Sequence, residues 1–234
     1  MQALDRLNLV PRPPLHLLPA GHRLPAGLSH ATVLPDIDWE TYSEAGYVWR
    51  EETQRWGALP DVAQDQKGLG VVGAMVYSEH PSTEILSLAY DLKDGRGKRH
   101  WRPGLPIPAD LWAHVLQGGL LEAHNVAFEY WIWANVAHRR MGWPLLRPEQ
   151  LRCAMGKGRS WGLPGALGKV GEVLGLQTQK DKRGIALLDR FSVPRNPTKT
   201  DPRKRIRPLW TLDDVEREVA EYQRWLQSSS SVAI

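Results

Sequence analysis

The sequence predicts an α/β protein in which a mixed sheet is flanked by helices. Two observations lead to this class: strand-like segments come first along the chain, and helical segments then alternate with short strand-like runs. Such an order is typical of a layered α/β domain and not of an all-α or all-β one. A length of 234 residues, 42% of them hydrophobic, suffices for one such domain with peripheral additions.

Five segments are expected to be strands. Residues 32–41 begin apolar and end in a cluster of acids, and residues 84–91 alternate in part between apolar and polar side chains. Residues 98–102 follow the turn signal at 94–97, which predicts a hairpin with 84–91. Two shorter runs, 120–123 and 151–155, are expected to complete the sheet.

Helices are expected between and after these strands. Residues 108–117 start at Pro108, and 126–141 form an aromatic-rich, largely buried helix after Asn125, a good N-cap. A third helix, 163–174, has Pro164 near its first turn, and a basic, proline-interrupted connector spans 177–210. The last helix, 211–227, carries Asp213 and Asp214 near its positive end.

This reading divides the chain into a flexible Pro-rich N-terminal arm (1–30), one domain (31–227) and a tail (228–234). The single Cys153 excludes an internal disulfide and a multi-cysteine zinc site, so carboxylates or histidines must carry any metal chemistry. No apolar stretch approaches the roughly 20 residues of a membrane helix. We therefore expect a cytoplasmic protein without a membrane partner.

The net charge of +4 is unevenly distributed along the sequence. Residues 177–210 hold ten Lys or Arg against three Asp, a local charge of +7, which leaves −3 for the rest of the chain. Such a division indicates an acidic metal-binding body beside a basic segment that meets phosphates. A solvated basic loop without a ligand explains the same charge equally well.

The strongest local signal is DIDWETYS, in which Asp38 and Glu40 stand two apart on an expected strand and so point to the same face. Two carboxylates 4 Å apart repel by about 1 kcal/mol in water and by about 4 kcal/mol at an effective dielectric of 20. Mg²⁺, a hard cation with oxygen ligands, removes that repulsion. The alternative is a chance tripeptide on a solvated strand edge.

Two further acids could join this pair. Glu129 lies near the first turn of the buried helix, where its alternative role is to offset the positive helix terminus. Asp214 precedes the last helix, and its spacing from Thr211 also fits a capping box. For His124 and Asn125, capping and core packing are favoured over catalysis.

Together these motifs resemble the DEDD-type 3′-to-5′ exonucleases of the ribonuclease-H-like fold, specifically the proofreading domain of phage-type, family-A-like DNA polymerases. Asp38 and Glu40 match the D-x-E strand of that family. His124, Asn125, Phe128 and Glu129 match its H-N-x-x-F-[D/E] helix start, and Asp214, Val215 and Glu218 match the end of its last motif. The resemblance extends over most of residues 32–220.

One position departs from the family. Trp210 stands four residues before Asp214, where the family has the tyrosine whose hydroxyl helps to orient the attacking water. Aligning Tyr222 to the tyrosine instead puts Leu226 at the position of the metal ligand. We prefer Asp214 because its D-V-x-x-E context matches.

The resemblance implies that Asp38, Glu40, Glu129 and Asp214 are catalytic and hold two Mg²⁺ or Mn²⁺ ions. The expected partners are the single-stranded 3′ end of DNA and a polymerase domain or subunit. The residues expected to contact the DNA are Thr41, Asn125, Lys180, Lys182 and Arg183. Trp161 is a candidate stacking surface, although core packing is favoured for it.

Two alternatives to an active exonuclease stay open. The chain could be a nucleic-acid-binding module of the same fold that has lost turnover, which Trp210 favours. It could also be a ribonuclease-H-like nuclease with a different substrate.

Overall fold

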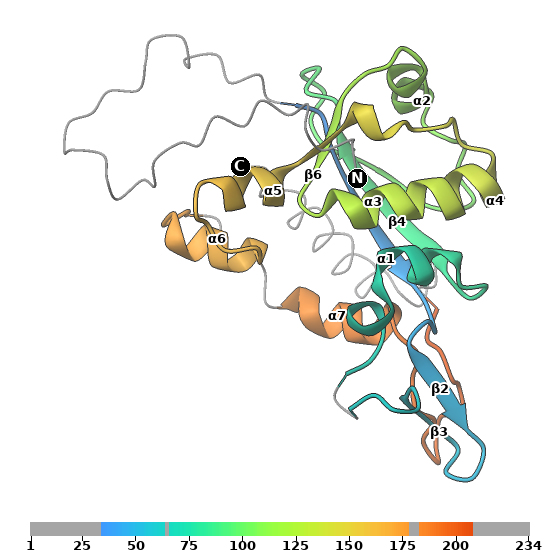
Figure 1. Cartoon of the computed structure of the whole chain (residues 1–234). Helices are drawn as coiled ribbons and strands as arrows, with labels where there is room; N and C mark the ends of the chain where they lie inside the picture. Colours follow the sequence, from blue (N-terminus) through green and yellow to red (C-terminus); the bar gives the residue numbers. More distant parts are fainter. Residues whose placement is uncertain (1–33, 64–65, 178–182, 208–234) are drawn as a thin grey trace.

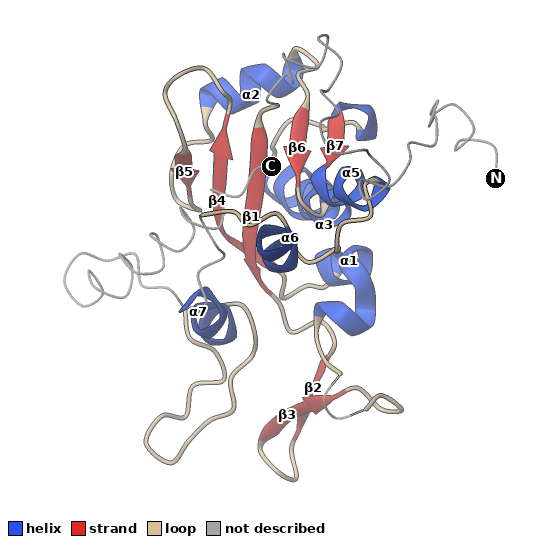
Figure 2. Ribbon diagram, turned by 90° about the vertical axis from the view of Figure 1, so that its left-hand side faces the viewer, coloured by secondary structure: helices blue, strands red, loops and turns tan. Residues whose placement is uncertain are grey.

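A computed structural model describes residues 34–63, 66–177 and 183–207, which form a five-stranded mixed sheet flanked by helices (Figure 1). The strand order is β5–β4–β1–β6–β7 (Figure 2), with β1 antiparallel to β4 and parallel to β6. The strands are β1 Asp36–Tyr42, β4 Glu84–Asp91, β5 Arg99–Trp101, β6 Leu121–Ala123 and β7 Leu151–Cys153. The predicted α/β class is confirmed, and this topology is compatible with a ribonuclease-H-like fold.

Helix α2 and the segments α3 and η3 supply buried side chains that pack in the core with those of the sheet. The segments α3, η3 and α4 follow one another without a break, so residues 126–141 form one rod, as predicted, with π-helical turns in its middle. The helical segments are α1 Leu69–Glu79, α2 Ala109–Leu116, α3 Val126–Ile132, η3 Trp133–His138, α4 Arg139–Met141, η4 Pro148–Gln150, α5 Ala154–Ser160, α6 Leu167–Val173 and α7 Arg183–Phe191.

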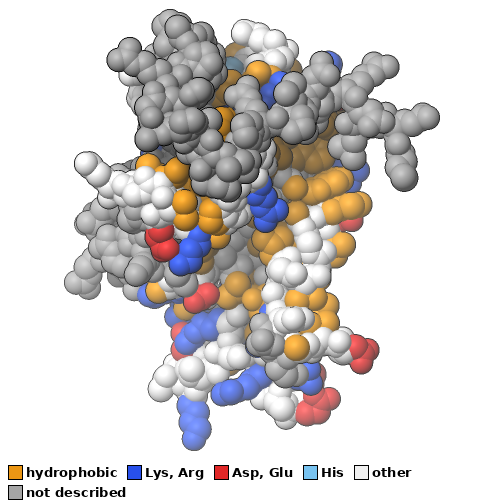
Figure 3. All heavy atoms as spheres, turned by 60° about the vertical axis from the view of Figure 1, so that its left-hand side comes forward, with side chains coloured by type: hydrophobic (Ala, Val, Ile, Leu, Met, Phe, Trp, Pro, Cys, Tyr) orange, Lys and Arg blue, Asp and Glu red, His pale blue; other side chains and the backbone are white. Residues whose placement is uncertain are grey.

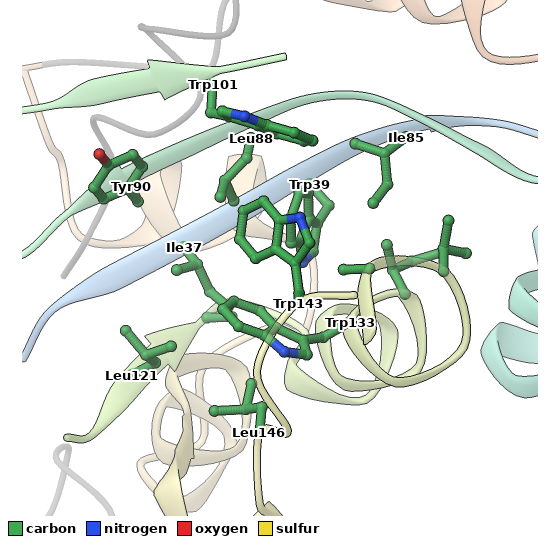
Figure 4. Packing of buried hydrophobic residues seen from close by; sticks show 14 of the residues in the cluster. Ile37, Trp39, Ile85, Leu88, Tyr90, Trp101, Leu121, Trp133, Trp143 and Leu146 are labelled. Atoms are coloured by element: carbon green, nitrogen blue, oxygen red, sulfur yellow. The ribbon is translucent and has the colours of Figure 1, made fainter. Parts of the chain in front are cut away.

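Four tryptophans form the centre of the main core (Figure 4). The ring of Trp39 on β1 lies edge-on to those of Trp101, Trp133 and Trp143, with centroid distances of 6.3, 5.8 and 5.3 Å. Each such aromatic pair contributes about 0.5–1.5 kcal/mol beyond its buried area. The Trp39 cluster therefore holds β1 to β5 and to the helical rod.

A second, smaller core lies at the far end of β1. Tyr42, Leu86 and Phe191 are buried together there, and Leu187 and Leu188 pack against them. Helix α7 thereby docks beside the end of β1 (Figure 2). The predicted basic, proline-interrupted connector over residues 177–210 thus contains a helix that was not predicted, because these apolar side chains give α7 a buried face among the basic residues.

A two-stranded hairpin, β2 (Tyr47–Arg50) and β3 (Arg55–Ala58), projects from one end of the molecule (Figure 1). Trp49 and Trp56 are cross-strand partners, with ring centroids 5.4 Å apart. Such directly opposed aromatic pairs are a main source of hairpin stability. The sequence analysis predicted no element in residues 43–83, which contain β2, β3 and α1.

The helix predicted at residues 163–174 begins only at Leu167. Pro164 lies in the preceding loop, where the carbonyl oxygen of Gly165 is 2.8 Å from Nε2 of His124. Helix α5 was not predicted. The expected N-terminal arm, last helix and tail lie outside the described residues. In the part of the chain that the structure describes, no helix is long and apolar enough to cross a membrane.

Candidate functional site

The candidate site lies where β1 extends beyond β6. Strand β1 pairs with β4 along its whole length, but its register with β6 contains only Asp36 opposite Glu122. The backbone N–H of Trp39 on this edge donates instead to Oε2 of Glu129, at 3.1 Å. A side chain from α3 thus takes the place of a neighbouring strand, and it brings a carboxylate to the middle of β1.

Asp38 and Glu40 point away from the tryptophan core, as the alternation of a strand predicts. Both side chains line a pocket of about 840 Å³. The register with β4 shifts between Glu40 and Thr41, and Thr41 lines the same pocket although regular alternation would turn it away. Such an irregularity commonly re-aims a side chain beside a functional site.

Glu129 is a strongly perturbed acid of this pocket. Its side chain is buried, with the residue only 4% exposed. Burial is the main cause that raises the pKa of Glu129 well above its ordinary value, and the negative charges of Asp38 and Glu40 raise it further. The Trp39 N–H acts in the opposite direction. Three carboxyl groups therefore influence one another across this pocket.

Helix α1 supplies a tyrosine that the sequence analysis missed. The hydroxyl of Tyr77 lies 2.9 Å from Oγ1 of Thr41, and both residues line the pocket. Burial raises the pKa of Tyr77 to about 12, to which Glu40 also contributes, so the hydroxyl stays protonated at neutral pH. The sequence offered no signal for it, because α1 itself was not predicted.

The position of Tyr77 is fixed by contacts between α1 and the helical rod. Nδ2 of Asn135 donates to Oγ of Ser78 at 2.8 Å. The guanidinium group of Arg140 donates to the carbonyl oxygens of residues 78, 79, 80 and 83. These bonds satisfy carbonyl groups at the end of a helix, which would otherwise lack partners. Hydrogen bonds to the helical rod therefore hold the end of α1, and with it the position of Tyr77 in the pocket wall.

The acidic side chains of the pocket are oxygen donors of the kind that a hard metal ion takes. In residues 34–63, 66–177 and 183–207, no three His, Cys, Asp or Glu side chains are grouped closely enough to hold a metal ion. Mg²⁺, however, is usually held by only one or two carboxylates together with water and phosphate oxygens. Asp38 and Glu40 on one face of β1 fit that requirement, and a cation would reduce the repulsion that raises the pKa of Glu129.

The structure brings three of the four predicted acids, Asp38, Glu40 and Glu129, to one pocket. Several other predicted residues lie outside the described part of the chain. They are the DNA-contacting Lys180 and Lys182 and the last-motif positions Trp210, Asp214 and Tyr222. Arg183 begins α7, but its side chain is not described. The part of the prediction that depends on the last motif therefore stays a prediction.

The helix start following β6 supplies two more predicted residues. Asn125 lines the pocket and occupies the N-cap position of α3, but its side chain makes no capping hydrogen bond. His124 also lines the pocket, and its ring contact with Gly165 fixes the loop before α6, which favours the predicted packing role. Trp161 is not among the residues that line the pocket.

Comparison with known proteins adds one finding. Over 139 residues the chain is 35% identical to the DNA polymerase of Bacillus phage SP02, a stretch that covers 58% of this chain and 20% of that polymerase. The chain thus spans about a fifth of the length of this relative. No protein-family model matches, and no solved structure matches significantly. The similarity supports a polymerase-related domain.

Proposed function

We propose that this polymerase-related domain is a metal-dependent 3′-to-5′ exonuclease that shortens single-stranded 3′ ends of DNA. The observation that carries the proposal is the convergence of Asp38, Glu40 and Glu129, from a strand and a helix about 90 residues apart, on one pocket. The similarity to a phage DNA polymerase supports a substrate of DNA.

The pocket is suited to a nucleotide at the end of a strand. Its volume of about 840 Å³ falls within the roughly 300–1,000 Å³ of small-ligand sites. A divalent cation bound there would supply Lewis-acid chemistry, activating water and stabilising the leaving oxygen. Asp38 and Glu40 would hold such a cation, with Asp214 as the further ligand that the resemblance implies.

Two contacts within the protein position groups of the pocket. The Trp39 N–H fixes the orientation of the Glu129 carboxyl group, and the hydroxyl of Tyr77 fixes Thr41. Both contacts are made within the protein, between β1 and the helices α3 and α1. Preorganised groups of this kind require no rearrangement when charge develops in a transition state.

One experiment tests the proposal directly. Single-stranded and 3′-recessed DNA labelled at the 5′ end are incubated with the protein, with Mg²⁺, with Mn²⁺ or with EDTA. Asp38→Asn is the test variant. Asp36→Asn is the control, because Asp36 lies on the same strand but pairs with Lys93 away from the pocket. We expect stepwise, metal-dependent shortening by the parent and the control, but not by Asp38→Asn.

The opposite outcomes are equally clear. Shortening in EDTA, or equal shortening by Asp38→Asn and the parent, would refute the proposed site. DNA binding without any shortening would support the second candidate, a nucleic-acid-binding module that has lost turnover. Trp210 favours that candidate, since it replaces the tyrosine of the family. Trp210→Tyr then tests whether a hydroxyl restores cleavage, and Asp214→Asn tests the last motif.

A further inference from the structure

We propose that the β2–β3 hairpin and the loop 194–207 form a basic arm that binds the phosphate backbone of the DNA strand leading into the acidic pocket. The basic arm is defined as residues 47–58 together with residues 194–207. The proposal rests on the proposed function, because it takes DNA as the ligand of the pocket, and it adds a second contact surface outside that pocket.

The two segments of the basic arm are joined by specific contacts. The backbone N–H of Trp56 on β3 donates to Oδ1 of Asn196 at 2.6 Å. Nζ of Lys204 lies 3.5 Å from the centroid of the Trp49 ring on β2, a close cation–π contact. The guanidinium group of Arg205 stacks at 3.5 Å on Tyr42, the last residue of β1. The loop is therefore fixed both to the hairpin and to the main sheet.

The basic arm has more positive charges than there are acidic side chains to pair with them. The hairpin holds two Arg and two Glu, whereas residues 194–207 hold six Lys or Arg against one Asp, which gives the arm a net charge of +5. Asp201 pairs with both Arg195 and Arg203. Glu84 on β4 pairs with Arg205 and Arg207 and lowers the local sum only to +4. Lys and Arg side chains are visible at this end of the molecule in Figure 3.

The basic groups are accessible as well as numerous. The side chains of Arg203 and Arg207 are 61% and 68% exposed, and Lys199 is also exposed. Exposed ion pairs of this kind contribute roughly 0–1 kcal/mol to stability. Lys199, Arg203 and Arg207 are thus not needed to hold the fold, and a polyanion can compete for these three cations at little cost.

The basic arm starts at the rim of the acidic pocket. Tyr47, the first residue of β2, lines the pocket, and so do Ser192 and Val193, which lead directly into the loop 194–207. Phosphates near Asp38, Glu40 and Glu129 are repelled by those carboxylates. Cations outside the pocket favour the retention of a strand whose end lies in it, and the arm, which begins at the rim, supplies such cations.

The arm is suited to phosphates more than to bases. Trp49 and Trp56 are half-buried against each other, and Lys204 lies over the ring of Trp49. These rings therefore stabilise the hairpin, and they are not an open platform for stacking. Binding through the arm should consequently depend on salt and not on base sequence.

The test measures binding of fluorescent single-stranded DNA in EDTA, where cleavage does not interfere, over a series of salt concentrations. The arm variant is Lys199→Gln with Arg203→Gln. The control is Arg96→Gln with Arg139→Gln. Arg96 matches Arg203 closely: its side chain is 60% exposed and pairs at 2.6 Å with the Asp two residues earlier, as Arg203 does at 2.7 Å. Neither Arg96 nor Arg139 lines the pocket.

Each contact with a single-strand phosphate contributes about 0.7 to the slope of log K against log salt. The arm variant should therefore lose about 1.4 from the slope and bind about 25-fold more weakly at 0.1 M salt, equally for mixed and homopolymer sequences. The control should match the parent, and thermal melting should show that both variants are folded.

A loss no larger in the arm variant than in the control, or an unchanged salt slope, would overturn the basic arm while leaving the exonuclease proposal intact. If the parent binds DNA but does not shorten it with Mg²⁺, the exonuclease proposal fails, and a weaker arm variant still supports the arm. If the parent binds no DNA at all, both proposals fail.

Discussion

Replacing Glu129 by glutamine is expected to make the fold more stable at neutral pH. Burial, followed by the charges of Asp38 and Glu40, raises the pKa of Glu129 well above its ordinary value of 4.5. A carboxyl group with a raised pKa contributes its full stability below the unfolded pKa and loses it as the pH rises towards the folded pKa. Glutamine has the same shape, retains an acceptor for the Trp39 N–H and does not titrate.

The size of the effect follows from this linkage. The Glu129→Gln variant should be about as stable as the parent near pH 4. Above pH 4.5 the free energy of unfolding of the variant should exceed that of the parent by about 1.4 kcal/mol more for each pH unit, until the folded pKa of Glu129 is reached. Thermal unfolding followed by circular dichroism at pH 4, 5, 6 and 7 measures this gap. If the stabilities of the parent and of Glu129→Gln changed with pH in the same way, the raised pKa of Glu129 would be refuted.

Glu129→Ala separates the hydrogen bond from the charge. It leaves the buried N–H of Trp39 without its acceptor, at a cost of about 1–3 kcal/mol. For a chain of this size each kcal/mol lowers Tm by about 2–4 °C, so the loss is about 2–12 °C near pH 4. A variant as stable as the parent at pH 4 would contradict the observed hydrogen bond.

A divalent cation bound by the pocket should raise the free energy of unfolding, because it offsets the repulsion between the carboxylates. Mg²⁺ at a hundred times its Kd would stabilise the folded state by about 2.7 kcal/mol. We expect that increase in the parent at pH 7 and little of it in Asp38→Asn, whereas Asp36→Asn should behave as the parent. Equal stabilisation of all three proteins by Mg²⁺ would mean that the cation binds elsewhere.

Three further substitutions test the framework of the site. Tyr77→Phe removes the 2.9 Å contact with Thr41 and should cost about 1 kcal/mol in urea unfolding; an unchanged midpoint would argue against the bond. Gly73→Ala places a side chain at φ +74° inside α1, where no atom crowds the new Cβ, so its cost of about 1–3 kcal/mol is backbone strain. Faster hydrogen exchange confined to α1 would confirm it. Trp143→Ala should cost about 3–5 kcal/mol in chemical unfolding, since its ring packs 5.2 Å from Trp133; a cost below about 1 kcal/mol would show that the core repacks.

Much of the sheet could be predicted from the sequence, because its strands have local signatures. The strand at residues 84–91 matches β4, and the acid-ended segment at 32–41 overlaps β1. Residues 43–83 could not be predicted in the same way. Helix α1 contains Gly70 and Gly73, which disfavour helix formation, and contacts with the helical rod hold it in place. A tertiary contact of this kind has no local signature.

The site was predictable in its parts but not in its geometry. The alternation of a strand placed Asp38 and Glu40 on one face, and the helix start placed Glu129 near a terminus. The sequence could not show that β6 ends early and leaves the Trp39 N–H for Glu129 to bind. It also could not show Tyr77 beside Thr41, because that contact joins residues 36 positions apart across an unpredicted helix.

The core and the site impose one shared constraint on β1. Trp39 points into a cluster with three other tryptophans, while its neighbours Asp38 and Glu40 point into the pocket. A slip of one residue in the register would bury two carboxylates among these rings and expose the indole, because strand side chains alternate between faces. The same tryptophan also holds Glu129 through its backbone. The packing of Trp39 therefore determines both which acids face the pocket and how closely the helix approaches them, so the aromatic core is itself what positions the carboxylates.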